Sequence, residues 1–316
     1  MNHVQFFGLE FNLNPVAFTL PILGGWDVYW YGILIGLGFC LAILYGLKNA
    51  SKVGLTGENL LDGIIITVPI AILGARSYYL LFNNPATFFS DFLKIHQGGL
   101  AIYGGIIGAV IGILISCYFR KFNIIDTLDI TAPGFFIGQA VGRWGNFFNQ
   151  EAVGTNTDLP WGMFSYGESG TKEHIMSMGN SSLDPMKPVH PCFLYESIWC
   201  IIGFIILSRV IKNRKFRGQL ILIYGMWYGI GRSFIEGLRT DSLMFGSIRV
   251  SQLLSILIVI ACLIIYILIL KKKAPKKEEA YEGVFGETED VFFSLEDIAD
   301  ETEDEILEES KDIENG

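Results

Sequence analysis

Residues 250–270 read VSQLLSILIVIACLIIYILIL, a run without one charged side chain. An α-helix needs about 20 mostly apolar residues to cross the hydrocarbon core of a bilayer. Working outward from this run, we find six further segments of similar length and apolarity. The seven predicted spans are approximately 28–47, 60–82, 99–119, 128–148, 193–211, 219–235 and 250–270. The sequence therefore predicts an all-α polytopic membrane protein with seven transmembrane helices.

The overall composition agrees with a membrane protein and excludes several other classes. Hydrophobic residues make up 51% of the 316 residues and charged residues only 17%. The net charge of -9 comes from residues 274–316, which hold 17 of the 32 acids and 3 of the 23 basic residues, so the rest of the chain is mildly basic. Basic residues are scattered singly between apolar runs, which argues against nucleic-acid binding. Five cysteines, four of them inside apolar runs, offer neither a disulfide framework nor a paired-cysteine metal site.

Basic residues in the short loops predict the orientation of the helices, because such residues are retained on the cytoplasmic side. They follow the first, third, fifth and seventh spans, at Lys48 and Lys52, Arg120 and Lys121, 212–217, and 271–273. We therefore expect the N-terminus outside and the C-terminus inside. Residues 1–27 then form an extracytoplasmic segment, 28–270 the membrane domain, and 271–316 a disordered, acidic cytoplasmic tail. The long polar loop at about 149–191 predicts a small extracytoplasmic head region.

Glycines at intervals of four residues predict close packing between helices. Such rows let backbones approach each other in lipid. The rows are Gly104, Gly108 and Gly112, then Gly134, Gly138 and Gly142, then Gly225 and Gly229.

Charged residues inside the predicted spans require an explanation, because an Arg at the centre of a membrane helix costs roughly 2.5 to 3.5 kcal/mol on insertion scales. Arg143 shares a helix face with Gln139, Asn146 and Gln150, and Arg232 shares one with Glu236 and Arg239; Arg76 is a third intramembrane cation. A single Arg near a helix end can be an anchor that snorkels to the interface. Two of them with polar partners at the outer leaflet instead suggest a receptor for a phospholipid head group, since a guanidinium binds phosphate with a fork of donors.

Three further candidates lie at the same predicted level of the membrane. Tyr103 follows a Gly-Gly segment at the outer start of the third span, Tyr31 lies at the outer start of the first, and His190 precedes the fifth. The alternative interpretation of Tyr31 is the aromatic belt of the interface, and a loop histidine is more often structural than catalytic. The remaining histidines lack any metal-ligand spacing.

Residues 142–154 read GRWGNFFNQEAVG, and this stretch resembles the signature of the prolipoprotein diacylglyceryl transferase family of bacterial inner-membrane enzymes. The Gly-Gly segment around Tyr103, the run 190–196, Tyr31-Gly32 and the run 231–236 support the resemblance, which covers about residues 17–270. The resemblance implies transfer of the diacylglyceryl group of phosphatidylglycerol to the lipobox cysteine of a preprolipoprotein, forming a thioether and releasing glycerol phosphate. It implies no cofactor and no metal.

The resemblance also implies roles for individual residues. Arg143 and Arg232 would grip the lipid phosphate, Asn146 and Glu151 would order the head group, and Glu236 would support Arg232. Gly154 would keep its loop tight. Many family members have a histidine, proposed as the base for the thiol, where this chain has Tyr103. The predicted catalytic set is Arg143, Arg232, Tyr103 and Glu151, and the predicted substrate-binding set is Tyr31, Asn146, Gly154, His190, Glu236 and Arg239.

The residues alone are compatible with two other classes of function. A transporter or flippase could use intramembrane Arg and Glu to bind an anionic solute, but no inverted repeat is evident and the charges gather at one face of the membrane. A catalytically inactive scaffold of the same fold is suggested only by Tyr103.

Overall fold

The computed structural model describes residues 2–21, 25–83, 85–94, 98–166, 184, 186–240, 244–245 and 248–272. These residues lie in a single compact unit. The predicted acidic tail lies outside the described residues from 273 onward, as do His96 and His174. In chain order the elements are β1(Asn2–Phe6), β2(Leu9–Leu13), β3(Val16–Leu20), β4(Trp26–Tyr29), α1(Trp30–Asn49), η2(Ala50–Val53), α2(Gly57–Asn83), η3(Pro85–Thr87), α3(Phe88–Asp91), α4(Ile102–Arg120), α5(Ile124–Asn149), β5(Phe164–Tyr166), α7(Cys192–Val210), η5(Ile211–Asn213), α8(Gln219–Leu238), β6(Met244–Phe245), β7(Ile248–Arg249) and α9(Val250–Lys271).

Long helices occupy all seven segments that the apolar runs predict. Five of them are long and apolar enough to cross a membrane within the described part of the chain, namely 30–53, α2, α4, 192–213 and α9. Helices α5 and α8 are 26 and 20 residues long but carry more polar side chains. The structure is thus mostly helical and compatible with a polytopic membrane protein.

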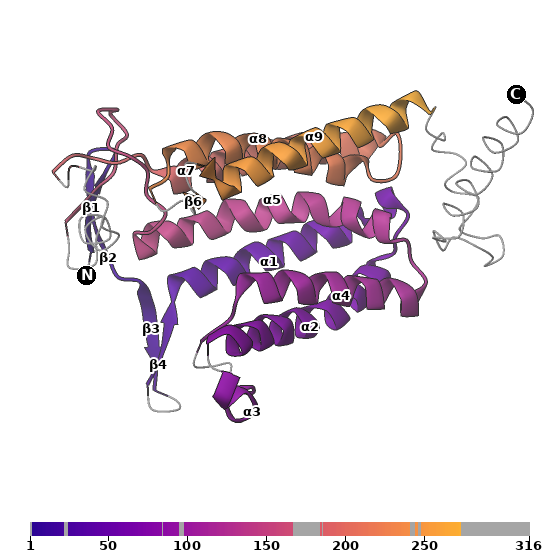
Figure 1. Cartoon of the computed structure of the whole chain (residues 1–316), viewed down its shortest axis with the longest axis horizontal. Coiled ribbons are helices and arrows are strands. Elements are labelled where there is room, and N and C mark those ends of the chain that lie inside the picture. Colours follow the sequence, from indigo (N-terminus) through magenta and orange to yellow (C-terminus); the bar gives the residue numbers. More distant parts are fainter. Residues whose placement is uncertain are drawn as a thin grey trace, which may run out of the picture. The chain divides into compact units, whose positions relative to one another are not determined.

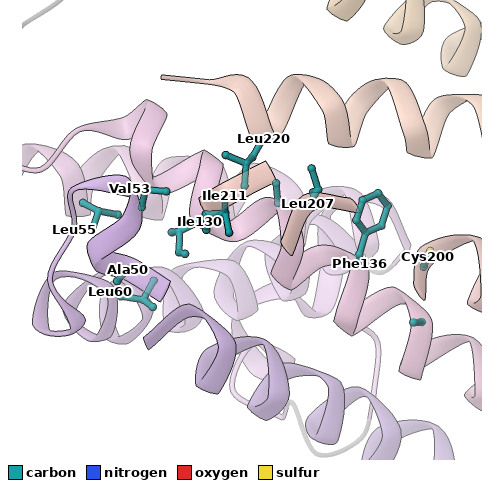
Figure 2. Packing of buried hydrophobic residues seen from close by; sticks show 12 residues of the cluster. Ala50, Val53, Leu55, Leu60, Ile130, Phe136, Cys200, Leu207, Ile211 and Leu220 are labelled. Carbon is teal, nitrogen blue, oxygen red and sulfur yellow. The ribbon is translucent and has the colours of Figure 1, made fainter. Parts of the chain in front are cut away.

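The helices pack side by side, and α5 is central to the arrangement (Figure 1). It packs against α1, α7 and α8, while α2 packs on α4 and α8 on α9. One core cluster joins α5, α7, α8 and the start of α2 with the residues that follow α1. It includes Ile130 and Phe136 of α5, Leu207 of α7 and Leu220 of α8, all almost fully buried (Figure 2).

Two of the predicted glycine rows form close helix contacts. A Cβ on Gly104 or Gly108 would come within 3.0 Å of the α2 backbone, and a Cβ on Gly229 would come 2.9 Å from the Ser255 carbonyl oxygen of α9. In the α5 row, a Cβ on Gly142 would meet nothing within 4 Å, but a Cβ on Gly38 of α1 would lie 3.1 Å from the Gly138 Cα, so α1 approaches closely there. The glycines of α4 and α8 therefore allow the backbone approach that membrane helices use.

Short strands accompany the helices, which the all-α prediction did not include. Strands β1 and β2 form a hairpin, and β5, from the predicted head region, pairs antiparallel with β1. Val4 and Phe6 of β1 pack on Phe147 of α5 and Phe193 of α7. The N-terminal segment and the loop after α5 therefore build one cap at the end of the bundle where α5 finishes (Figure 1). Sequence patterning missed this pairing because it joins segments about 160 residues apart.

Candidate active site

The centre of the candidate site is the carboxylate of Glu196, which lies in the first turns of α7 and is 5% exposed. Its Oε1 atom lies 2.8 Å from Arg232 Nη1 and 3.5 Å from Arg239 Nη1, and its Oε2 atom forms an ion pair with Arg143 Nη2. One buried carboxylate therefore gathers three arginines from separate parts of the chain.

The directions of the helices explain why these side chains meet. Arg143 lies near the end of α5, Arg232 near the end of α8, and Glu196 near the start of α7. Because α7 runs antiparallel to the other two, its first turns face their last turns. Arg232 also pairs with Glu236 one turn later, with 2.6 Å between Nη2 and Oε2. We call Arg143, Arg232, Arg239, Glu196 and Glu236 the arginine–glutamate cluster.

Arg239 belongs to this cluster, but it lies just beyond the helix in which its spacing predicted it. Helix α8 ends at Leu238, and Arg239 has extended torsions of φ -71° and ψ 148°. Its backbone forms an antiparallel bridge with Gly154. The predicted shared helix face of Arg232, Glu236 and Arg239 is therefore wrong for Arg239, although its guanidinium still reaches Glu196.

The charges of the cluster leave it one net positive charge, since three guanidinium groups face two carboxylates. The carboxylate side chains are only 6% and 1% exposed, whereas those of Arg143 and Arg232 are 21% and 18% exposed. A guanidinium carries five N–H donors, so carboxylates on its buried side leave donors free on its open side. In a medium of low dielectric constant such an arrangement favours an anion with several acceptor oxygens, such as a phosphate.

Gly154 lies where three segments of backbone cross. Its N–H donates to the His190 carbonyl oxygen at 3.0 Å, and the N–H of Thr155 donates to the Leu238 carbonyl oxygen at 2.8 Å. A Cβ at Gly154 would lie 2.6 Å from His190 Cβ and 2.9 Å from Cys192 Sγ. The glycine therefore permits the contact that ties the segment after α5 to the end of α8 and the start of α7.

Glu151 lies in a turn just beyond α5 and is held by two amides. Its Oε1 atom accepts hydrogen bonds from Asn146 Nδ2 at 3.0 Å and Asn149 Nδ2 at 3.2 Å. The flanking residues Gln150 and Ala152 both have left-handed torsions, with φ of 55° and 59°. Such torsions are strained for residues other than glycine and accumulate at functional sites. Asn146 and Glu151, which were predicted to act on the head group together, thus contact each other directly.

His190 is linked to the first turn of α7 through a tyrosine. Its Nδ1 atom lies 3.1 Å from the Tyr195 hydroxyl, which also accepts a hydrogen bond from Trp161 Nε1 at 2.9 Å. Burial lowers the pKa of His190 below its ordinary value, because desolvation disfavours the imidazolium. The imidazole is therefore neutral near pH 7, and its neighbour Tyr195 directly precedes Glu196.

The two predicted tyrosines occupy different places. The ring of Tyr31 packs against Gly145, two residues beyond Arg143, where a side chain would clash with it. Tyr103 lies in the first turn of α4, is 67% exposed, and has its ring centroid 6.2 Å from that of Tyr78. The ion pairs described for the arginine–glutamate cluster do not include Tyr103.

Glu196 lies in the run 190–196 of the family resemblance but is not among the predicted site residues. One signal could have found it, since Glu196 is the only acidic residue in the predicted span 193–211. Two intramembrane arginines on neighbouring helices need a counter-charge, and a lone intramembrane acid is a functional candidate by default. By contrast, Gln139, which shares the predicted face of Arg143, donates to the Tyr224 hydroxyl at 2.8 Å and lies outside the cluster's ion pairs.

These features define a class of protein, namely a helical protein of membrane type with a polar site, rich in arginine, between its helices. The chain belongs to the prolipoprotein diacylglyceryl transferase family, whose model matches residues 15–268. It is 43% identical over 270 residues to a protein of Finegoldia magna named phosphatidylglycerol--prolipoprotein diacylglyceryl transferase, covering 84% of this chain and all of the relative. Proteins with the same name from Clostridioides difficile and Limosilactobacillus reuteri are 41% and 39% identical, covering 82% and 85% of this chain and 97% and 95% of their own.

Proposed function

We propose that this chain transfers the diacylglyceryl group of phosphatidylglycerol to the lipobox cysteine of preprolipoproteins at the bacterial plasma membrane. The observation that carries the proposal is the buried Glu196 carboxylate, which holds Arg143 and Arg232 side by side with part of each guanidinium exposed. Membership of the family supplies the reaction.

The proposed topology has seven spans, with the N-terminus outside and the C-terminus in the cytoplasm. Helices α5 and α8 count as the fourth and sixth spans, although they are more polar than the other five. Arg143 of α5 and Arg232 of α8 both pair with Glu196 of α7, and Gln139 of α5 donates to the Tyr224 hydroxyl of α8. These polar side chains therefore need not meet lipid. In this topology, which the basic residues of the loops support, the arginine–glutamate cluster lies toward the outer leaflet.

In the proposed reaction the cysteine sulfur attacks the glyceryl carbon that bears the phosphate. A sulfur–carbon bond forms as the carbon–oxygen bond breaks, and the electron pair leaves on the phosphate oxygen of glycerol phosphate. Negative charge grows on that phosphate in the transition state. Guanidinium donors fixed beforehand by Glu196 and Glu236 stabilise this charge without having to reorganise, which is the largest electrostatic contribution available to the site.

The acceptor thiol must lose a proton, since a free cysteine has a pKa of about 8.5 and only a small fraction is thiolate at neutral pH. A tyrosine is a poor base on its own. We therefore assign the main stabilisation to Arg143 and Arg232, and we assign to Tyr103 the orientation of substrate or the passage of the thiol proton.

The other site residues act on substrate in this proposal. Asn146 and Glu151 order the lipid head group, and Gly154 and His190 shape the loop beside it. Glu236 fixes Arg232, and Arg239 adds a third cation on the same carboxylate. Tyr31 packs beside the end of α5 and lines the lipid's approach.

The proposal is tested with purified protein in detergent, phosphatidylglycerol and a lipobox peptide, by following glycerol phosphate release and peptide mass. We expect the peptide mass to rise by one diacylglyceryl unit with wild type, and no increase with Arg143→Ala or with a Cys→Ser peptide. Lipid binding without any transfer would support a scaffold or a flippase instead. The assignment of roles would be falsified if Tyr103→Phe abolished turnover while Arg143→Lys left it unchanged.

A further inference from the structure

Arg76, in the second half of α2, is a buried cation that the arginine–glutamate cluster does not use. Its side chain is only 4% exposed, and its guanidinium donates to backbone carbonyls. Nη1 lies 2.6 Å from the Gly98 oxygen and 3.1 Å from the Gly99 oxygen, and Nη2 lies 2.6 Å from the Asp91 oxygen. The carboxylate of Asp91 is instead bonded to Lys94, at 2.8 Å.

These acceptors belong to the segment that leads from α3 into α4. The N–H of Ala101 donates to the Ala75 carbonyl oxygen at 3.0 Å, so the segment is also anchored to α2 beside Arg76. Gly98 and Gly99 have φ of 81° and 75°, and a Cβ on Gly99 would lie 2.7 Å from Arg76 Nη1. The Gly98 and Gly99 carbonyls and the backbone bond of Ala101 thus tie residues 98–101, immediately before α4, to α2.

Burying a charged group that has only neutral acceptors costs free energy. The hydrogen bonds from Arg76 to three backbone carbonyls offset part of this cost. Arg76 donates to these carbonyls from two nitrogens held apart in a planar fork, whereas an ammonium has three donors on a single nitrogen and does not reproduce this spacing. The hydrogen bonds of Arg76 to Gly98 and Gly99 lie just before α4, which begins at Ile102. Tyr103 is the second residue of α4.

We propose that Arg76 is a positioning residue for Tyr103, and that it acts by fixing the turn 98–101 rather than by binding lipid phosphate. This inference rests on the proposed function, in which Tyr103 orients substrate or passes the thiol proton. A phosphate receptor needs accessible donors, whereas Arg76 is 4% exposed and both of its terminal nitrogens are bonded to the chain. Its Nε, which has no partner among the described residues, is buried as well.

A double-mutant cycle tests this inference. We expect Arg76→Lys to lower kcat by about tenfold and to leave KM for phosphatidylglycerol within about twofold, because it misplaces Tyr103 without removing a lipid contact. In a Tyr103→Phe background, Arg76→Lys should lower kcat by less than about twofold further, since its effect passes through the phenol. Hydrogen exchange at Ala101 should become faster in Arg76→Lys.

Arg120→Lys is the matched control, because Arg120 bridges α4 to α2 through Asp62 at the opposite end of α4, at 2.8 Å. It should leave both kcat and exchange at Ala101 unchanged. Gly99→Ala is a second variant in case Arg76→Lys does not fold, since its Cβ disturbs the same turn. It should show the same dependence on Tyr103.

Three results would overturn the inference. Additive losses in the double variant would make Arg76 a purely structural residue, and a raised KM with unchanged kcat would make it a lipid ligand. Full activity of Tyr103→Phe would show that turnover does not need the Tyr103 hydroxyl, so Arg76 could not act through it. Failure of the transferase proposal would look different, because the wild-type enzyme would then transfer nothing. Arg143→Ala, assayed in parallel, is the inactive reference.

Discussion

A cluster of arginines and carboxylates lies at each end of helices α5 and α8, and the two clusters differ in charge. The arginine–glutamate cluster lies where both helices finish. Where they begin, Arg214 Nη1 lies 2.8 Å from Asp126 Oδ1 and 2.9 Å from Asp129 Oδ2, and Arg217 lies 3.4 Å from Asp126. We call these four residues the aspartate clamp. Two cations face two carboxylates in the clamp, whereas three face two in the arginine–glutamate cluster.

The use of the carboxylate oxygens differs as well. Asp129 is fully buried and accepts from the backbone N–H groups of Gly218 and Ile221, both at 2.9 Å, so a residue of α5 caps the start of α8. Gly218 has no side chain with which to supply this cap itself. The aspartate clamp is balanced in charge and its buried carboxylates are satisfied by the fold, so it stabilises structure although Arg217 is 41% exposed. The arginine–glutamate cluster has one excess cation, which is suited to an anionic ligand. The same residue types therefore have different uses at the two ends.

The largest expected effect is on catalysis, from Glu196→Gln. The change removes the charge that holds three arginines together, so we expect kcat to fall by about a hundredfold while phosphatidylglycerol still binds to the freed guanidinium groups. Measurement of kcat and of lipid affinity checks this. Glu10→Gln, in the exposed β2 strand, is the control. Unchanged kcat in Glu196→Gln would contradict the division between the two clusters.

The next effect is on stability, from Asp129→Asn. Removing one partner of a buried ion pair leaves an uncompensated charge, and we expect a loss of about 3 kcal/mol in the free energy of unfolding. Asp62→Asn breaks the partly exposed pair with Arg120 and should cost less than about 1 kcal/mol. Thermal unfolding in detergent measures both. A larger loss of stability in Glu196→Gln than in Asp129→Asn would contradict the conclusion that the aspartate clamp is the more stabilising of the two clusters.

The smallest expected effect is a dependence of stability on pH. It arises at the end of the bundle that holds the arginine–glutamate cluster. Because the pKa of His190 is lowered by burial, the unfolded chain takes up this proton at a higher pH than the folded chain does. The stability contributed by neutral His190 is therefore complete above the ordinary histidine value of about 6.5 and is lost as the pH falls below it. We expect the unfolding temperature to drop more between pH 7.5 and 5.5 in wild type than in His190→Gln. Equal drops would show that His190 does not contribute.

The helices were largely predictable, because each apolar run is long and bilayer thickness sets the length that a spanning helix needs. The predicted run 193–211 and α7(Cys192–Val210) differ by one residue at each end, and 250–270 extends by one residue in α9(Val250–Lys271). The start of α5 was missed by four residues, because its first turn carries the polar Asp126 and an Asn123 side chain that caps it. Hydropathy cannot identify a helix turn that is polar and buried by ion pairs.

Sequence by itself determined the helix positions, the family signature and the pair Arg232–Glu236, since each follows from local spacing along one element. Tertiary structure decided that Glu196 joins the arginines, that Arg239 reaches the cluster from beyond α8, and that the N-terminal hairpin pairs with the loop after α5. It also decided that the carbonyl bonds of Arg76 hold the turn before Tyr103. The physical reason is that a counter-charge or a strand partner is recognised by distance in space, and a linear pattern records only distance along the chain.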